Sequence, residues 1–309
     1  MTLNKILEQE EHYIAPKASK KKITANIIYY IVGTILSLIF LLPVFYMIAT
    51  STKTDEQIAQ SAGTIMMFIP NFDSIATIFD NYILLFGEHE IWKYALNSLM
   101  YAAITIVLNV LVNALAGYVL AKFHFPGKKF FLFLILFLII VPVETSIIPL
   151  YMIAVRLLKL TGGLSPVAVV LPGVISIFNI FLYMQFFTSI PKEYEEAMHI
   201  DGANRVRIFF DLILPLSKPI VATTAVFCFI GVWNDFLWPQ LILPTDLGSS
   251  DAWPVQTIQA FLIGFQSIPE VTGGERMAAL VVTTIPIFIV YALAQKYIVK
   301  GFGTAGLKL

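Results

Sequence analysis

Glu144 and Asp235 each stand alone as a charged residue within a long apolar run. Glu144 lies in the run 130–155 and Asp235 in the run 219–245. A carboxylate inside a membrane-spanning segment is costly, so it usually faces a cavity or a partner group. Both carboxylates could accept hydrogen bonds from a polyol in a solute pathway. The alternative is that each pairs with a polar group of another span or snorkels toward the headgroups.

Tryptophan and asparagine side chains lie beside Asp235 in the sequence. Trp233 and Trp238 could stack on the C–H face of a pyranose, and Asn234 lies between them. An aromatic belt at the outer membrane interface explains the two tryptophans equally well, and we favour the belt. The candidate pathway residues are therefore Glu144, Trp233, Asn234, Asp235 and Trp238.

Three asparagines, Asn97, Asn109 and Asn113, lie along one apolar run. Asn109 and Asn113 are four residues apart and share a helix face. Hydrogen bonding between helices is the default role of such residues, and contact with a sugar is the alternative. Gly117, four residues after Asn113, would permit another helix to approach closely.

The sequence contains no pattern typical of catalysis or metal binding. Cys228 is the only cysteine, and the four histidines are scattered without metal-ligand spacing. A Ser/His/Asp constellation and carboxylates paired at matching depth are both missing, which argues against a membrane-embedded enzyme. A phosphate-binding G-x-x-x-x-G-K-[ST] loop is missing as well. We expect no cofactor on this chain and ATP hydrolysis, if any, on a partner.

The composition predicts that lipid surrounds the elements that position these residues. Of the 309 residues, 58% are hydrophobic and 13% are charged, and the mean hydropathy is +0.81. A soluble domain carries roughly 25% charged residues. The net charge is zero, which argues against a nucleic-acid partner.

Six apolar runs reach the roughly 20 residues that a helix needs to cross a membrane. The runs lie within Lys22–Lys53, Lys93–Lys122, Phe130–Val155, Leu160–Pro191, Pro219–Thr245 and Met277–Gln295. The first run is too long for the apolar part of a signal peptide, so we expect an uncleaved helix. The sequence predicts an all-α integral membrane protein with six transmembrane helices.

The distribution of Lys and Arg predicts the orientation. With the N-terminus inside, fifteen of these residues fall on the cytoplasmic side and five outside. Both termini are therefore expected in the cytoplasm. The predicted divisions are a cytoplasmic tail (1–22), a first transmembrane helix (23–50), an extracytoplasmic segment (51–92), a core with five transmembrane helices (93–296) and a cytoplasmic C-terminal tail (297–309).

The long internal loop, residues 189–218, has the pattern of two short helices with a corner between them. Pro191 suits the start of a helix, and the acidic residues that follow suit its first turn. Gly202 supplies the stop because glycine accepts a left-handed conformation. Such an element suits docking to a partner. An ordinary amphipathic surface loop is the alternative.

This loop resembles the EAA loop of ABC importer permeases, in which Glu-Ala-Ala is followed by Gly and later by Leu-Pro. The matching residues here are Glu196, Ala197, Met198, Asp201, Gly202, Ala203, Leu212, Leu214 and Pro215. Met198 replaces the second alanine and Leu212 replaces an isoleucine. The resemblance implies that Glu196, Ala197, Met198, Asp201, Gly202 and Ala203 couple the chain to ATPase subunits. We call residues 189–218 the coupling loop.

Other segments resemble carbohydrate importer permeases, closest to the smaller permease of the maltose type. They are Trp233–Pro239, Gly301–Gly306, and the residues Pro142, Glu144 and Ile148–Tyr151. The resemblance implies the type I ABC importer permease fold in a bacterial cell membrane. It also implies a second permease subunit, two ATPases that bind ATP and Mg, an extracytoplasmic solute-binding protein, and a sugar as substrate.

The predicted external loop 244–276 resembles the permease loop that reaches into the binding protein to displace sugar. Its candidate residues are Gly248, Trp253, Gly264, Gly273 and Gly274, of which the glycines suit a mobile probe. A passive connector is the alternative. Two further functions stay open: an ABC permease for another polar solute such as glycerol phosphate, and a secondary sugar transporter, although the latter has no use for an EAA loop.

Overall fold

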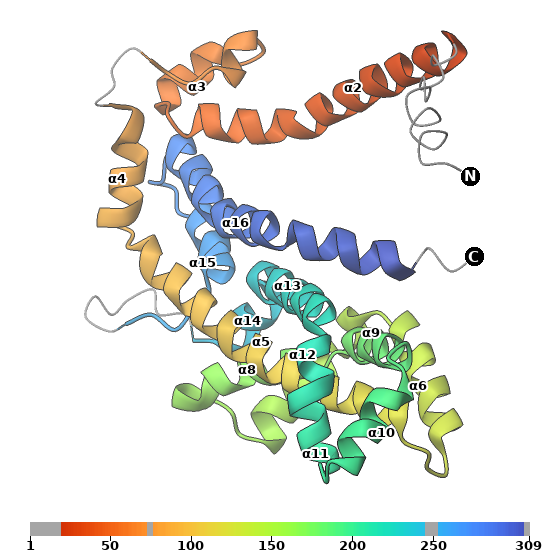
Figure 1. Cartoon of the computed structure of the whole chain (residues 1–309). Coiled ribbons are helices and arrows are strands. Elements are labelled where there is room, and N and C mark those ends of the chain that lie inside the picture. The colour runs from red at the N-terminus through yellow and green to blue at the C-terminus, as the bar shows by residue number, and fades with distance from the viewer. Residues whose placement is uncertain (1–19, 73–76, 245–252, 306–309) are drawn as a thin grey trace.

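The computed structural model describes residues 20–72, 77–244 and 253–305, and every regular element in these ranges is helical (Figure 1). The predicted all-α class is therefore confirmed for the described residues. The longer helices are α2 (Lys20–Thr50), α5 (Ile91–Lys122), α6 (Lys128–Ile140), α8 (Ser165–Val174), α9 (Ile177–Thr188), α13 (Lys218–Asn234) and α16 (Gly273–Ala305).

Shorter helices connect the longer ones. They are α3 (Asp55–Ser61), α4 (Asp80–Gly87), α7 (Ile147–Met152), α10 (Lys192–Ile200), α11 (Arg205–Ile208), α12 (Leu214–Leu216), α14 (Leu237–Ile242) and α15 (Ile258–Gln266). Single turns of 3₁₀- or π-helix cover Ile65–Phe68, Thr77–Phe79, Val143–Ser146, Ile153–Leu157, Gly162–Leu164 and Phe209–Ile213.

Three described helical segments are long and apolar enough to cross a membrane by themselves: Asn26–Thr50, Ile91–Lys122 and Gly273–Gln295. Three bent helix pairs reach the same length only together, so the described residues hold up to six spans. The bends are 98° between α6 and the segment after it, 43° between α8 and α9, and 81° between the α11–α12 segment and α13.

The predicted third span is not one continuous helix. Helix α6 ends at Ile140, and the chain turns before Val143–Ser146 begins. Pro142 accounts for the break because it has no N–H to donate and because it disfavours a helical conformation at Val141. Val141 accordingly has extended backbone angles.

Helix α2 presents apolar side chains on nearly all of its surface. None of its most apolar stretch is buried within the chain, and Tyr30 and Phe40 are each 77% exposed. It packs on α16 near its C-terminal end and diverges from the rest of the chain beyond that point (Figure 1). An exposed apolar surface of this size is expected only against lipid or a partner subunit.

Helix α5 lies at the centre of the fold, where α8, α9 and α13 pack on it. Gly117 allows the approach of α9, because a Cβ there would lie 2.6 Å from the Tyr183 Cβ and 3.0 Å from the Met184 backbone nitrogen. The predicted close approach at Gly117 is therefore confirmed. A buried aromatic and aliphatic cluster with Trp233 and Phe265 joins α5 to α4, α13, α15 and α16.

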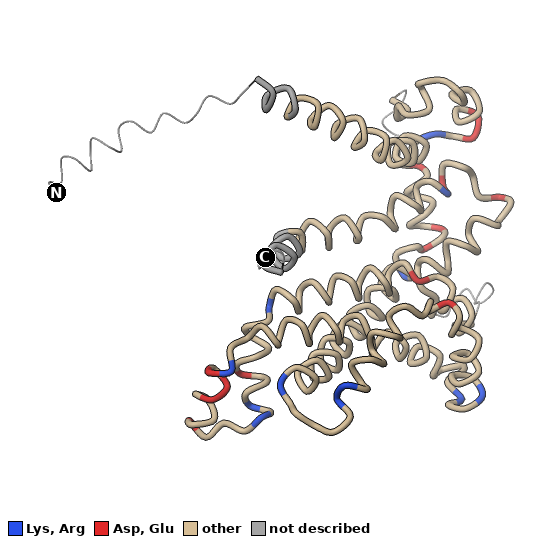
Figure 2. The backbone as a smooth tube through the Cα atoms, turned by 90° about the vertical axis from the view of Figure 1, so that its right-hand side faces the viewer, with Lys and Arg blue, Asp and Glu red and all other residues tan. Residues whose placement is uncertain are grey.

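Charged residues gather at the ends of the helices, and the stretches between them are almost free of charge (Figure 2). One mixed group of acidic and basic residues belongs to α10 and α11 of the coupling loop. This arrangement places most charged residues outside an apolar slab.

Candidate functional site

The coupling loop folds as two short helices with Gly202 at their corner. Backbone bonds close the corner: the Gly202 N–H donates to the His199 oxygen at 3.0 Å and the Ala203 N–H to the Met198 oxygen at 2.9 Å. Gly202 has a φ of +81° and nothing within 4 Å of where a Cβ would lie. The predicted positive φ is confirmed, and the need for glycine is conformational rather than steric.

The six predicted coupling residues divide between the surface and the interior. Met198 is partly buried, and Ala203 is buried in the cluster that supports the loop. The exposed members are Glu196, Ala197, Asp201 and Gly202. Apolar side chains surround them, with Ile200 87% exposed and Val206 65% exposed. An exposed corner that is both apolar and acidic has the chemistry of a docking surface.

The sequence reasoning missed Glu195, the residue before the motif. Its carboxylate is buried and lies 2.9 Å from the Lys122 ammonium at the end of α5 and 3.8 Å from the Arg205 guanidinium. The Tyr118 hydroxyl also donates to it at 3.2 Å. A signal existed in the sequence, because Glu195 is three residues before the inward-packing Met198 and so shares its helix face.

The candidate pathway carboxylates differ in their surroundings. Glu144 is exposed in the turn between α6 and α7, and among the described residues none pairs with its carboxylate. Asp235 follows the last residue of α13, and its carboxylate accepts the Trp238 backbone N–H at 3.2 Å. Asn234, the last residue of α13, is exposed. Glu144 is therefore the carboxylate that is free for a solute or a partner subunit.

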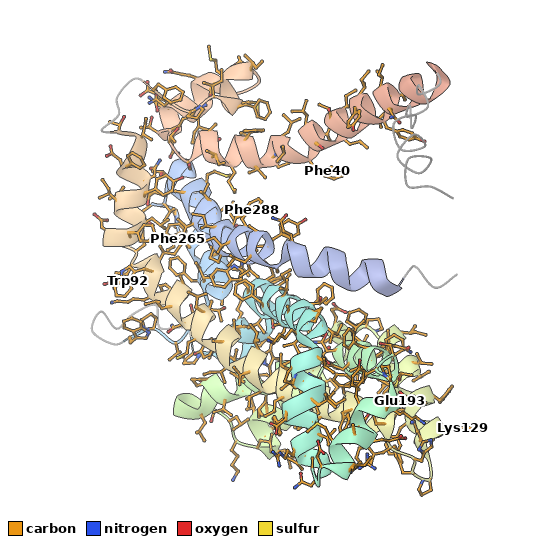
Figure 3. The ribbon with its side chains drawn as sticks, in the orientation of Figure 1. Phe40, Trp92, Lys129, Glu193, Phe265 and Phe288 are labelled. Carbon is orange, nitrogen blue, oxygen red and sulfur yellow. The ribbon has the colours of Figure 1, made fainter. Side chains whose placement is uncertain are left out.

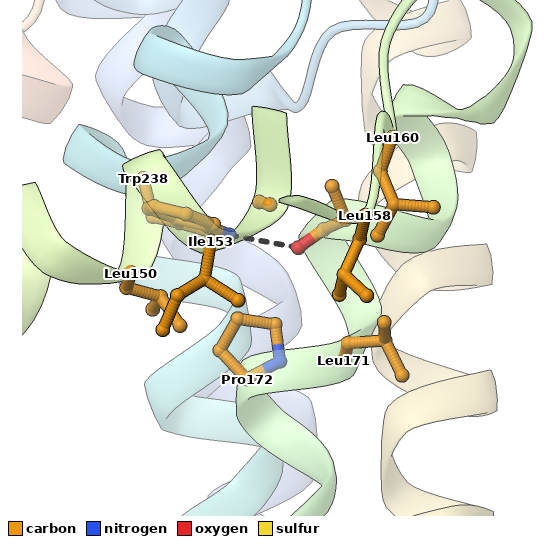
Figure 4. A pocket seen from close by; sticks show the side chains of 9 residues that line it. Leu150, Ile153, Leu158, Leu160, Leu171, Pro172 and Trp238 are labelled. Carbon is orange, nitrogen blue, oxygen red and sulfur yellow. Dashed lines mark hydrogen bonds between the residues drawn. The ribbon is translucent and has the colours of Figure 1, made fainter. Parts of the chain in front are cut away.

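Both candidate tryptophans lie inside the protein, so the aromatic-belt interpretation is wrong. The Trp233 ring is 1% exposed and stacks on Phe229, and its indole N–H donates to the Thr283 carbonyl at 3.0 Å. The Trp238 indole N–H donates to the Ala168 carbonyl at 2.9 Å beside an apolar cavity of about 140 Å³ (Figure 4). Packing of distant helices, not the membrane interface, holds these rings.

Asn109 and Asn113 of α5 bond to the neighbouring helix α8, as the default interpretation predicted, whereas Asn97 bonds to the backbone of the 244–276 loop. Asn109 donates to the Gly173 carbonyl at 2.7 Å, and Asn113 donates to the Val174 carbonyl at 3.0 Å and accepts the Ser176 N–H at 3.0 Å. These partners are backbone carbonyl and N–H groups at the break between α8 and α9, where the regular pattern of intrahelical hydrogen bonds is interrupted. The two side chains satisfy a helix break that would otherwise expose backbone polar groups within the apolar slab.

The 244–276 loop contains the helix α15 and packs against α5. Helix α15 buries Ile258 and Phe265, and Trp253 is 51% exposed and donates its indole N–H to Asn97 at 2.8 Å. Gly264 lies in α15 with open space beside it. Gly248 lies outside the described residues.

Gly273 and Gly274 begin α16 and are closely packed. The Gly273 N–H donates to the Asp55 carboxylate at 2.7 Å, and a Cβ on Gly274 would overlap the Lys53 carbonyl and the Asn81 side chain. Packing therefore accounts for these two glycines. It also holds the start of α16 against the segment that follows α2.

Lys53 is a buried lysine in the segment that follows α2, and it bonds to the backbone of the same segment. Lys53 is 5% exposed, and its ammonium donates to the Met66 carbonyl at 2.7 Å. Burial lowers the pKa of Lys53 below its ordinary value of 10.5. A pocket of about 570 Å³ opens beside it, lined by Gln57, Phe72 and other residues of the turn.

Residues 113–303, more than half of the chain, match the family described as "Binding-protein-dependent transport system inner membrane component". The chain belongs to this family. The match covers α8 to α15 completely, including the coupling loop and the 244–276 loop. The family match therefore includes both loops that the sequence singled out, and the chain is a membrane component of a transport system.

Relatives with curated names match nearly the whole chain. The arabinooligosaccharides transport system permease protein AraQ of Halalkalibacterium halodurans is 28% identical over 88% of this chain and 93% of its own length. The diacetylchitobiose uptake system permease protein NgcG of Streptomyces coelicolor is 33% identical over 85% of this chain and 82% of its own. The sn-glycerol-3-phosphate permease protein UgpE of Salmonella typhi is 31% identical over 85% and 90%.

Solved structures share the fold of this permease. A chain of a bacterial ABC transporter involved in the import of the acidic polysaccharide alginate matches with a TM-score of 0.70, 24% identity, and coverage of 91% of this chain and 99% of its own. A chain of the alginate transporter in complex with an alginate pentasaccharide-bound periplasmic protein matches with a TM-score of 0.57 and 14% identity. The ABC permease fold predicted from the coupling loop is supported on this basis.

Proposed function

We propose that this chain is the transmembrane permease subunit of a bacterial ABC importer that moves a sugar or oligosaccharide into the cell. The observation that carries the proposal is the corner at Gly202, whose positive φ and exposed surroundings occur in the loop that resembles the ATPase-docking motif. Membership of the binding-protein-dependent transport family supports it.

The proposed assembly has a second permease subunit, two ATPases that bind ATP and Mg, and an extracytoplasmic binding protein. In this assembly the chain crosses the membrane six times as a type I permease, with both termini in the cytoplasm. The coupling loop meets the ATPases, and the 244–276 loop meets the binding protein. The arabinooligosaccharide and diacetylchitobiose relatives favour an oligosaccharide substrate.

The relative UgpE supports glycerol phosphate as a second candidate substrate. Uptake by the reconstituted complex, with its binding protein, decides between them. The panel consists of arabino-oligosaccharides, diacetylchitobiose, alginate oligosaccharides and sn-glycerol-3-phosphate. ATP-dependent uptake of one of the saccharides is the expected result. Uptake of glycerol phosphate alone would identify glycerol phosphate, and not a saccharide, as the substrate. A complex that transports none of the four compounds would contradict the proposed substrate class.

The docking role of the coupling loop has its own test. Gly202→Val forces a β-branched residue into the left-handed region at a cost of about 1–2 kcal/mol. We expect fewer ATPase subunits in the purified complex, or ATP hydrolysis without uptake. Gly63→Val is the matched control, because Gly63 also has a positive φ, +72°, and nothing within 4 Å of a Cβ but lies between α3 and the turn Ile65–Phe68, outside the coupling loop. A Gly202→Val complex with normal ATPase stoichiometry and normal uptake would remove the docking role.

A further inference from the structure

Helix α5 contacts, at its two ends, the two loops to which the proposed function assigns partner proteins. It has 32 residues and spans about 48 Å at 1.5 Å per residue. Trp92, at its first turn, lies on the side of the molecule away from Glu193 of the coupling loop and Lys129 (Figure 3). One continuous element therefore reaches from the 244–276 loop to the coupling loop.

The last turn of α5 holds the coupling loop through a buried ion pair. The Lys122 ammonium lies 2.9 Å from the Glu195 carboxylate and donates to the Ile190 carbonyl at 2.7 Å. Tyr118, one turn earlier, donates its hydroxyl to the other Glu195 oxygen. Both charged side chains are less than a tenth exposed. Removing one member of such a pair leaves a buried charge without compensation, so α10 is expected to move together with α5.

The first turns of α5 hold the 244–276 loop by its backbone. The Asn97 amide donates to the Pro254 carbonyl at 2.6 Å and to the Gln256 carbonyl at 3.1 Å. Tyr101, one turn later, donates to the Val255 carbonyl at 2.8 Å. Asn97 also accepts the indole N–H of Trp253, a half-exposed ring of the same loop. These contacts hold the loop at a defined position on the helix.

Between its ends α5 is an uninterrupted helix without proline. The neighbouring pair α8 and α9 bends by 43°, and the chain after α6 bends by 98°. A bent pair can absorb a displacement at its break, whereas a continuous helix carries it to the other end. Helix α5 is thus a continuous element that can carry a displacement between the two loops, whereas α13, which follows the coupling loop, meets the α11–α12 segment at 81°.

We propose that α5 is a rigid connector through which the state of the 244–276 loop is communicated to the coupling loop, with Asn97 and Glu195 as its positioning residues. The proposal rests on the proposed function, since it needs a binding protein at one loop and ATPases at the other. Because a single element would join the two loops, interrupting the connector at either end should have the same consequence for stimulation by the binding protein. Demonstrated coupling, rather than spatial continuity, is the decisive evidence.

The test compares two single variants with their double variant in the reconstituted complex. Glu195→Gln keeps the size and an acceptor for Tyr118 but removes the charge opposite Lys122. Asn97→Leu keeps the volume but removes the bonds to the loop backbone. The quantities measured are subunit stoichiometry, basal ATPase activity, and the stimulation of ATPase activity by the binding protein loaded with the transported member of the uptake panel.

We expect each single variant to assemble and to keep its basal ATPase activity, while stimulation falls about tenfold, within the usual range of coupling between sites. The double variant should fall no further, because either substitution already interrupts the one connector. Lys122→Met should lose stimulation in the same way, because it removes the positive charge. Lys122→Arg keeps the charge and should retain most of the stimulation. Lys129→Gln, which removes an exposed charge outside both loops, is the control and should stay near the wild type.

Three results would overturn the connector. They are normal stimulation in both single variants, a double variant whose loss is the product of the single losses, and loss of assembly, which would assign the contacts to folding alone. A wild-type complex that no loaded binding protein stimulates would instead contradict the proposed function. The two failures are therefore distinguishable.

Discussion

Gly117→Ala should destabilise the permease at the crossing of α5 and α9. A Cβ at Gly117 would lie 2.6 Å from the Tyr183 Cβ and 3.2 Å from the Ile180 carbonyl oxygen. Carbon atoms in ordinary contact are about 3.5–4.0 Å apart, so the helices must separate by about 1 Å. The obstacle is backbone and Cβ on the far side, which no rotamer change can remove.

The magnitude follows from the contacts that such a separation would stretch. Overpacking of this kind costs about 1–3 kcal/mol. Asn113, one turn before Gly117, makes two bonds of 3.0 Å to Val174 and Ser176. Lengthening by about 1 Å takes both beyond hydrogen-bonding range, at roughly 0.6 kcal/mol each in a membrane protein. The total is about 2–4 kcal/mol.

Thermal unfolding of the purified complex in nanodiscs measures this change. Gly117→Ala should lower the Tm by roughly 5 °C or more, since 1 kcal/mol corresponds to a few degrees in a chain of this size. Gly33→Ala is the matched control, because Gly33 also lies within a long apolar helix but has nothing within 4 Å of a Cβ. Alanine is the better helix former, so the control should leave the Tm unchanged or raise it. An unchanged Tm for Gly117→Ala, or an equal fall for Gly33→Ala, would refute the reasoning.

Three further predictions concern the pathway, the topology and the outer segment. Glu144→Gln should lower uptake and leave complex assembly intact, and loss of assembly would show a structural role instead. In a Cys228→Ala background, an impermeant thiol reagent applied to intact cells should label Ser61→Cys but not Lys300→Cys, and labelling at Lys300→Cys would contradict the six-span topology. Because burial lowers the pKa of Lys53, the folded segment loses this proton before the unfolded chain does, so stability should rise as the pH increases toward 10.5. The Tm of the wild type should therefore rise relative to that of Lys53→Met over this range, and a constant difference would exclude the effect.

The sequence predicted the structure best at positions where a single local physical requirement determines the backbone conformation. A charge-free run of about 20 residues has few stable options in lipid other than a helix, and the long helices α2, α5 and α16 lie where such runs were predicted. Gly202 was placed correctly at a positive φ because a short helix that turns sharply needs a left-handed residue. Neither inference needed knowledge of distant contacts.

Prolines show where the same reasoning is insufficient. Pro43 and Pro286 lie inside the continuous helices α2 and α16, whereas Pro142 ends α6 and the chain turns by 98°. Each of these prolines removes one backbone donor, and the sequence around each is apolar. The outcome depends on whether neighbouring groups can satisfy the released carbonyls. That information lies in the tertiary structure.

Tryptophans and carboxylates at the candidate site pose the same problem. Trp233 bonds to a carbonyl 50 residues away and Trp238 to one 70 residues away. Residue type and depth alone favoured a belt at the interface, which is wrong. Glu195 and Glu196 are adjacent acids in one short helix, yet only Glu195 is buried. Its partner Lys122 ends a separate span, so the pairing becomes visible only when α5 and α10 are brought together.

The asparagines of α5 and the break between α8 and α9 explain one another. A helix that stops within an apolar slab releases carbonyl and N–H groups that lipid cannot satisfy. Asn109 and Asn113 bond to groups of this kind at Gly173, Val174 and Ser176. The two asparagines therefore supply hydrogen bonds to the backbone groups that the helix break leaves without intrahelical partners. The same backbone groups supply partners for the two buried asparagines. At this crossing the buried Asn109 and Asn113 of the continuous helix α5 thus accompany irregular backbone between α8 and α9.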